Sequence, residues 1–224
     1  MKEANIPSPL KSSIVIPVPK ISSPQTIEND LRPISLSSSM AKVMEGFTCT
    51  RLLKDLEGKI DPRQYARKGH STTDALLYMM QTIHEALDGG EAGARIFFAD
   101  FSKGFDLIDH SILIQELYKL QVHPALLSWI SAFLFNRRQA VRIGSVLSQW
   151  QTLKGGIPQG TKLGVVLFMV MTNSLLANWH LRTKFVDDTS ALEIIPRNSI
   201  SLLNFAVSDI HEFANEHNMK LNPK

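Results

Sequence analysis

The spacing of apolar residues along the chain predicts where helices and strands form. Apolar residues that recur every three or four positions, such as Met40, Val43 and Phe47, predict a helix with one buried face. Short apolar runs that are bounded by Pro, Gly or polar residues predict strands. Helices are expected over residues 40–55, 73–88, 108–120, 124–134, 163–178 and 199–218. Strands are expected over residues 13–20, 31–36, 94–99, 139–143, 149–153, 184–186 and 191–195.

The order of these elements predicts an α+β chain. In the second half, strand, helices, hairpin, helix and a second hairpin follow one another, which is typical of an antiparallel sheet backed by helices. The first half is more helical and more polar, and a boundary between the two is expected near residues 89–93.

Composition narrows the class of protein. Hydrophobic residues make up 44% of the 224 residues, so a buried core is expected. The net charge of +3 is mildly basic and is compatible with a nucleic-acid partner. Cys49 is the only cysteine, which excludes an internal disulfide and a zinc site built on several thiolates.

Two segments bear on the compartment. The N-terminus is polar and unlike a secretory signal, and the longest apolar stretch, 163–181, is broken by polar residues and predicts a buried helix. We therefore expect an intracellular protein, nuclear or cytoplasmic, that is not secreted and has no membrane-spanning segment.

The first candidate for chemistry is a pair of adjacent carboxylates, Asp187 and Asp188, between two apolar runs. This pattern predicts a hairpin with both residues at or beside its tip. Adjacent anions repel and raise each other's pKa unless a cation lies between them and a partner. Asp is also a common turn former, so a plain solvated turn is the alternative for the pair alone.

A third carboxylate, Asp100, ends the predicted strand 94–99. If the two strands are neighbours, Asp100, Asp187 and Asp188 converge at one edge of a sheet. Carboxylate oxygens suit Mg²⁺, and two such ions would activate an attacking hydroxyl and stabilise a leaving pyrophosphate. The alternative for Asp100 alone is a cap at the end of a strand.

Six segments in sequence resemble the motifs of reverse transcriptases of non-LTR (LINE-type) retrotransposons. Phe97–His110 resembles motif A, Gly155–Gly164 resembles motif B and Phe185–Asp188 resembles motif C. Leu31–Leu36 and Gln64–Thr73 are similar to the two fingers motifs, and Met219–Lys224 is similar to the end of motif D. They occur in the family's order and cover the chain from about residue 12 to its end.

The resemblance implies the fingers and palm of a right-hand polymerase. Fingers are expected over 13–92 and the palm over 93–224, after a flexible arm at 1–12. The palm would be an antiparallel ferredoxin-like sheet backed by helices, with a helical and hairpin insertion at about 108–154. Because the chain stops just after motif D, no thumb is expected, and a polymerase without a thumb would hold primer–template poorly.

The resemblance also implies an activity and a site. The activity is RNA-directed DNA synthesis, which adds dNTPs to a DNA primer on an RNA template and uses two Mg²⁺ ions, or Mn²⁺ in their place. Catalytic and metal-binding roles fall to Asp100, Asp187 and Asp188. Contacts to the dNTP fall to Phe105 under the sugar, Arg67 and Lys68 at the triphosphate, Gln159 and Gly160 at the base and template, and Lys220 at the leaving pyrophosphate.

Two alternatives stay open on the sequence. One is a truncated retrotransposon copy that keeps the fold, performs no catalysis and at most binds RNA or a hybrid weakly. The other is a relative of group II intron or telomerase reverse transcriptases, which share motifs A to C but match the fingers motifs less well.

Overall fold

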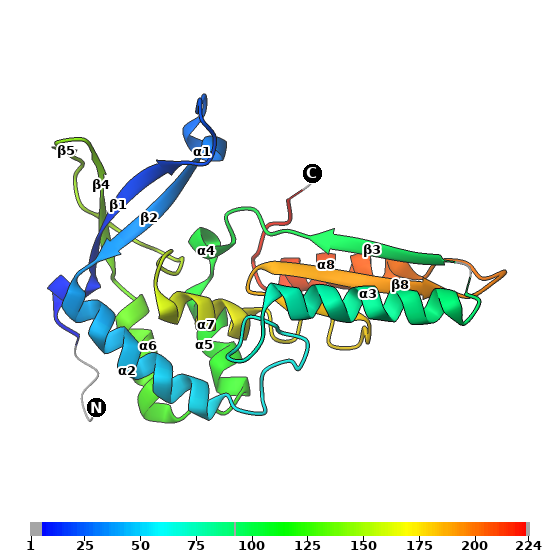
Figure 1. The fold of residues 1–224 in the computed structure, drawn as a ribbon. Helices are drawn as coiled ribbons and strands as arrows, with labels where there is room; N and C mark the ends of the chain where they lie inside the picture. Colours follow the sequence, from blue (N-terminus) through cyan, green and yellow to red (C-terminus); the bar gives the residue numbers. More distant parts are fainter. Residues whose placement is uncertain (1–5, 92, 223–224) are drawn as a thin grey trace. The chain divides into compact units, whose positions relative to one another are not determined.

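The computed structural model describes residues 6–91 and 93–222. The chain packs into two compact units, and each unit is built from two separate stretches (Figure 1). Unit 1 consists of Met1–Glu57 and Phe105–Leu167, and unit 2 consists of Gly58–Gly104 and Phe168–Lys224. These two units are defined by packing within the chain. The division into fingers over 13–92 and palm over 93–224 is different and stays a prediction.

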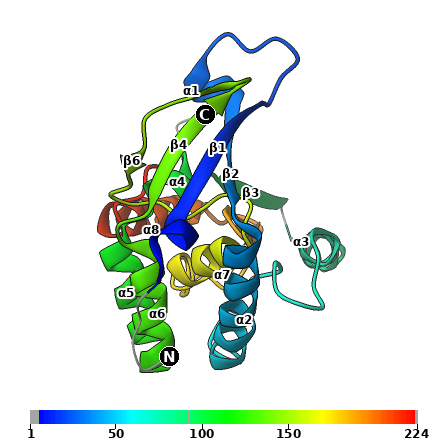
Figure 2. The ribbon, with the colours of Figure 1, turned by 90° about the vertical axis from the view of Figure 1, so that its left-hand side faces the viewer.

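Unit 1 contains a mixed sheet with strand order β2-β1-β4-β5. β1 (Ser12–Pro19) pairs antiparallel with β2 (Leu31–Ser37) and parallel with β4 (Arg138–Ile143). The short β5 (Val146–Leu147) and β6 (Gln151–Thr152) both pair with β4. Figure 2 shows β2, β1 and β4 side by side, although about 120 residues of sequence separate β1 from β4 (Ser12↔Arg138).

The helices of unit 1 begin where the sequence supplies a cap. α2 (Ser39–Asp55) begins after Ser38, whose side chain accepts from the backbone N–H of Ala41, and α5 (His110–Lys119) begins after Asp109 in the same way. α6 (Pro124–Leu134) has Pro at its first position and packs against α5 and α2. Side chains that are essentially inaccessible form the core: Leu52, Ile108, Leu113, Leu117, Ile130, Leu134 and Leu163.

Unit 2 contains an antiparallel sheet with strand order β3-β8-β7. Its strands are β3 (Gly93–Ala99), β7 (Arg182–Phe185) and β8 (Asp188–Ile195). α3 (Thr72–Asp88) and α8 (Leu203–Glu216) lie on opposite sides of this sheet (Figures 1 and 2). Because helices cover both faces, β8 is mostly buried, with Ala191 and Leu192 almost inaccessible.

The remaining elements are short or cross between the units. η1 (Ser8–Lys11) precedes β1, and α1 (Ile27–Asp30) lies within the predicted polar loop. α4 (Gly104–Leu107) and α7 (Lys162–Met171) each contain a boundary between the two units. Residues 1–5 of the predicted arm and Pro223–Lys224 of motif D lie outside the described residues.

Most predicted elements are found, and three helices and one strand needed correction. The helix expected over 199–218 is α8 and spans only Leu203–Glu216, and the strand expected over 149–153 is only the two-residue β6. The helix expected over 108–120 begins only at His110, because Asp109 caps it and Gly104–Leu107 forms a separate turn. The helix expected over 163–178 ends at Met171, because the Lys184 ammonium takes the carbonyls of Thr172 and Asn173. The prediction of a chain that mixes sheets and helices is confirmed.

Across residues 6–91 and 93–222, no helix combines the length and the apolar character that crossing a membrane requires.

Candidate active site

The β7–β8 hairpin places Asp187 in its turn, as the sequence predicted. Phe185 pairs with Asp188, so Val186 and Asp187 are the two residues of the loop. Val186 has a φ of 57°, in the left-handed region that two-residue hairpin turns use at their first position. A β-branched residue there costs roughly 1–3 kcal/mol and needs support from its surroundings.

Asp100 lies at the same end of the sheet. β3 pairs with β8 from Gly93↔Ile195 to Ala99↔Thr189, so Asp100 follows β3 at the level where Asp188 begins β8. The neighbour of β3 is therefore β8, the second strand of the hairpin, whereas β7, the strand that leads into the turn, lies on the other side of β8. The three carboxylates come from one strand end and one hairpin of unit 2.

The carboxylates influence one another. Burial raises the pKa of Asp187, its own backbone N–H opposes this shift, and Asp188 and Asp100 raise the pKa further by repulsion. Burial and then the charge of Asp100 raise the pKa of Asp188. This repulsion is what a bound cation would relieve.

The donor set fits a metal ion that is only partly enclosed by protein. Within the described part of the chain, no three Asp, Glu, His or Cys side chains are close enough to hold an ion by themselves. Asp100 and Asp188 are exposed, however, and Mg²⁺ commonly takes one or two protein carboxylates and completes its shell with water and substrate phosphates. The residues present suit such a site and do not suit a closed structural cage.

A cavity adjoins the carboxylates. It has a volume of about 410 Å³, and both Asp100 and Asp188 line it. Its other walls are mainly apolar and come from α3 and the sheet: Leu76, Met79, Met80, Ile96, Phe98 and Phe185. A hollow of this volume beside charged groups is within the range of ligand pockets in proteins.

The motif D segment holds Asp100 in place. The Asn222 side chain donates to Oδ2 of Asp100 at 3.0 Å, and its backbone N–H donates to the Asp100 carbonyl at 2.9 Å. The backbone N–H of Ser102 donates to the carbonyl of Lys220 at 2.7 Å. Lys220 therefore lies in the segment that runs beside Asp100, with its side chain exposed.

Comparison with known proteins decides the family. The family profile described as "Reverse transcriptase (RNA-dependent DNA polymerase)" matches residues 18–224. The chain belongs to the reverse transcriptase family.

Reverse transcriptases of LINE-type retrotransposons are among the proteins that this chain resembles in sequence. The chain is 31% identical to the "Probable RNA-directed DNA polymerase from transposon BS" of Drosophila melanogaster and 29% identical to the RNA-directed DNA polymerase from mobile element jockey of the same species. Each match covers 75% of this chain and 19% of the relative, so the chain spans about a fifth of their length. This chain is thus a LINE-type reverse transcriptase domain.

Solved reverse transcriptases share the fold. Telomerase from Candida tropicalis, solved in complex with a fragment of telomeric RNA, superposes with a TM-score of 0.67. The match covers 97% of this chain and 40% of the telomerase chain at 12% identity, so it shows the fold alone.

Arg67 and Lys68 differ in how this reverse transcriptase domain holds them. Nε of Arg67 donates to the Gln64 carbonyl at 3.0 Å, and Nη2 donates to the Pro62 carbonyl at 2.9 Å. The Arg67 guanidinium thus stabilises the loop in which it lies, while the Lys68 side chain is exposed. The sequence predicted triphosphate contacts for both and did not predict this bracing.

Phe105, Gln159 and Gly160 lie in unit 1, where the motif B loop is bonded to the second half of motif A. The carbonyl of Phe105 accepts from Ile157 at 2.7 Å. Gly156 has a φ of 82°, and a Cβ there would lie 2.7 Å from the carbonyl oxygen of Asp106. The loop therefore requires Gly at this position.

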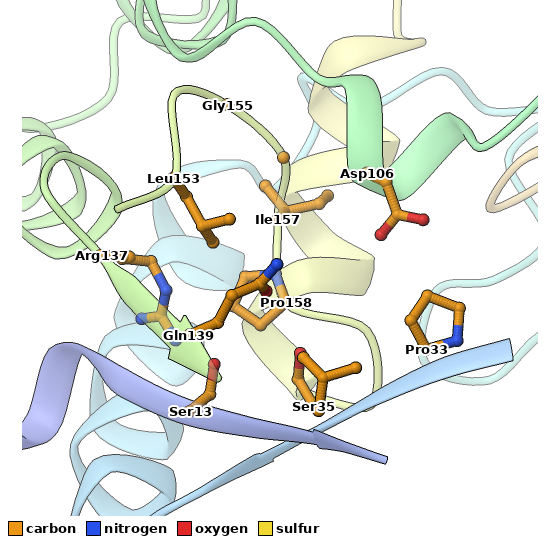
Figure 3. A pocket seen from close by; sticks show the side chains of 12 residues that line it. Ser13, Pro33, Ser35, Asp106, Arg137, Gln139, Leu153, Gly155, Ile157 and Pro158 are labelled. Atoms are coloured by element: carbon orange, nitrogen blue, oxygen red, sulfur yellow. The ribbon is translucent and has the colours of Figure 1, made fainter. Parts of the chain in front are cut away.

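A cavity of about 210 Å³ lies beside this loop in unit 1 (Figure 3). Asp106, which accepts from the Gln159 amide at 3.1 Å, lines it with Ser35 and Arg137. Arg137 is 1% exposed, and none of its guanidinium nitrogens has a hydrogen-bond partner among the residues described. Burial lowers the pKa of Arg137 and the charge of Glu45 opposes this, while the guanidinium packs 4.4 Å from the Phe133 ring centre.

Sequence reasoning missed an ion cluster that supports the hairpin. Asp61 accepts from Arg182 at 2.8 and 3.0 Å and from Lys184 at 2.7 Å, and all three side chains are buried or nearly so. Burial would raise the pKa of Asp61, but the hydrogen bonds and charges of Arg182 and Lys184 outweigh it and lower the pKa. Burial lowers the pKa of Lys184 to about 8, against the opposing effect of Asp61.

Proposed function

We propose that this chain is the RNA-directed DNA polymerase domain of a LINE-type retrotransposon. It adds dNTPs to a DNA primer paired with an RNA template. The observation that supports the proposal is that Asp100, Asp187 and Asp188 lie at the same end of the unit 2 sheet, within a chain that matches the reverse transcriptase family over residues 18–224. Unit 2 then supplies the catalytic part of the palm, with its ferredoxin-like sheet.

Three carboxylates have the chemistry that nucleotidyl transfer needs. Asp100, Asp187 and Asp188 would hold Mg²⁺, or Mn²⁺ in its place, and the bound ions would supply Lewis acidity for the primer hydroxyl and the leaving pyrophosphate. The carboxylates' own repulsion supports this role, because it disfavours the cation-free arrangement. Asn222 keeps the Asp100 carboxylate oriented.

The remaining predicted residues would bind the incoming nucleotide. The Phe105 ring would lie under the sugar and leave no room for a 2′-hydroxyl, which selects deoxynucleotides. Gln159 and Gly160 would shape the pocket for base and template. Lys68 and Arg67 would approach the triphosphate, and Lys220 would approach the leaving pyrophosphate and act as its proton donor.

Partners follow from this function. The chain would contact an RNA template, a DNA primer and dNTPs, and its mild positive charge is compatible with that. The match spans 19% of each of these relatives, so their remaining segments would contribute further to holding primer and template.

A primer-extension assay tests the proposal. Residues 1–224 are incubated with Mg²⁺, dNTPs and a DNA primer on an RNA template, beside Asp187→Asn and the control Asp209→Asn on the exposed face of α8. We expect distributive extension by the wild type and the control and none by Asp187→Asn. Equal extension by wild type and Asp187→Asn would refute the assigned site. Hybrid binding without any extension would favour the alternative, a binding module without catalysis.

A further inference from the structure

The segment that precedes Arg67 lies along strand β7 and extends the unit 2 sheet. Gln64 forms a parallel bridge with Lys184. The backbone N–H of Tyr65 donates to the Lys184 carbonyl at 2.8 Å, and the backbone N–H of Lys184 donates to the Arg63 carbonyl at 2.9 Å. A stretch of the fingers motif is thereby bonded to the strand that leads into the Asp187–Asp188 turn.

The side chain of Gln64 reaches past this bridge to the turn itself. Its Oε1 accepts from the backbone N–H of Val186 at 3.1 Å and from the backbone N–H of Ala66 at 3.1 Å. The residue is 1% exposed, and its Nε2 has no hydrogen-bond partner within the described residues. One buried oxygen therefore joins the fingers motif to the residue immediately before Asp187.

The bonded residue is the one whose backbone is strained. Val186 has a φ of 57°, a conformation that a β-branched side chain disfavours. If the φ of Val186 relaxed, the Phe185–Val186 peptide would rotate and the Val186 N–H would lose its buried acceptor. Gln64 thus stabilises the turn conformation that presents Asp187 and Asp188 beside Asp100.

We propose that Gln64 is a positioning residue for the metal-binding carboxylates, which rests on the function proposed above. It acts through Val186 and touches no substrate. The side-chain oxygen carries this role, because Oε1 accepts both hydrogen bonds and Nε2 makes no hydrogen bond within the part of the chain that is described. Residues that orient metal ligands in this way typically change metal affinity or activity by about 10- to 100-fold when they are removed.

Three variants separate positioning from general stability. Gln64→Met keeps length and burial but removes the acceptor, and Gln64→Glu keeps an acceptor oxygen in the same place. The matched control is Asn173→Ala. The Asn173 side chain also bonds this segment to another part of unit 2, accepting from the backbone N–H of Asp61 at 2.8 Å and donating to the carbonyl of Lys59 at 3.1 Å.

Two readouts are measured on residues 1–224: the dissociation constant for Mn²⁺ alone, by electron paramagnetic resonance, and kcat and KM for dTTP in primer extension. We expect Gln64→Met to weaken Mn²⁺ binding and to lower kcat by about 10- to 100-fold each, with KM for dTTP changed less than threefold. Gln64→Glu, which keeps the acceptor oxygen, should recover most of the Mn²⁺ affinity. Asn173→Ala should change neither readout more than threefold.

The two proposals fail separately. Mn²⁺ affinity that stays within threefold of wild type in Gln64→Met would overturn the positioning role, as would an equal loss in Asn173→Ala. A wild type that binds Mn²⁺ but never extends a primer would refute polymerase activity alone, and the Mn²⁺ comparison would still decide the role of Gln64. A wild type without measurable Mn²⁺ binding would overturn both.

Discussion

Replacing Asp61 by Asn tests whether the buried ion cluster supports the catalytic hairpin. The Asp61 side chain is 3% exposed and faces Lys184, at 0%, and Arg182, at 11%. Asn keeps the volume and one acceptor oxygen but removes the charge. Its amide N–H groups would then point at cationic donors, and a buried ammonium and a nearly buried guanidinium would lose their counter-ion.

The expected loss follows from that geometry. Removing one partner of a buried ion pair typically costs about 3–5 kcal/mol, because the remaining charge is left uncompensated. At about 2–4 °C per kcal/mol for a chain of this length, Tm should fall by roughly 6–20 °C. The fall in Tm should be at the lower end of this range if Lys184, whose pKa is already lowered to about 8, releases its proton in the variant.

Urea unfolding followed by circular dichroism measures this loss. Lys184→Met is measured alone and together with Asp61→Asn, so that the four proteins form a double-mutant cycle. We expect a coupling energy of about 1–3 kcal/mol between the two positions. A loss below about 1 kcal/mol in Asp61→Asn, or no coupling to Lys184, would refute the view that this cluster stabilises unit 2.

Two further predictions concern charge and backbone. Between pH 8 and 10.5 the unfolded chain keeps the Lys184 proton that the folded chain has released, so this group makes the free energy of unfolding rise with pH. Lys184→Met should abolish that rise in urea midpoints, and an unchanged pH profile would contradict it. Gly156→Ala should cost about 2 kcal/mol or more, because of its φ of 82° and the approach to the Asp106 carbonyl. Gly46→Ala, where an added Cβ would meet nothing within 4 Å, should stabilise α2 by about 0.5–1 kcal/mol in urea unfolding of both variants. Equal changes in stability for Gly156→Ala and Gly46→Ala would contradict this expectation.

Local signals in the sequence predicted the parts of the site that depend on local structure. The apolar runs before Asp100 and Asp187 end where the carboxylates stand, and the strand ends are found there. Ser38 and Ser71 cap the starts of α2 and α3, and Gly89 ends α3, so local chemistry also sets where these helices begin and end.

Contacts between distant segments were not predictable from the same patterns. The parallel pairing of β1 with β4 and the end of α7 at Met171 depend on partners far along the chain, because tertiary packing overrides local propensity. Gln64 and Asn222 stood inside recognised motifs, but nothing in their spacing showed which backbone groups they would bond. Asp61 precedes Pro62 in a loop, where no spacing of apolar residues indicates that a side chain is buried.

Asp100 and the Asp187–Asp188 turn are proposed to form one catalytic site. The most direct test of this proposal is the rate of adding a single dNTP to a DNA primer on an RNA template by wild type, Asp100→Asn, Asp187→Asn and the double variant. Because residues of one catalytic unit are not additive, each single variant should lose about 10³-fold or more, and the double variant should lose no more than the worse single one. Losses that multiply, or an Asp100→Asn variant as fast as wild type, would contradict a shared site.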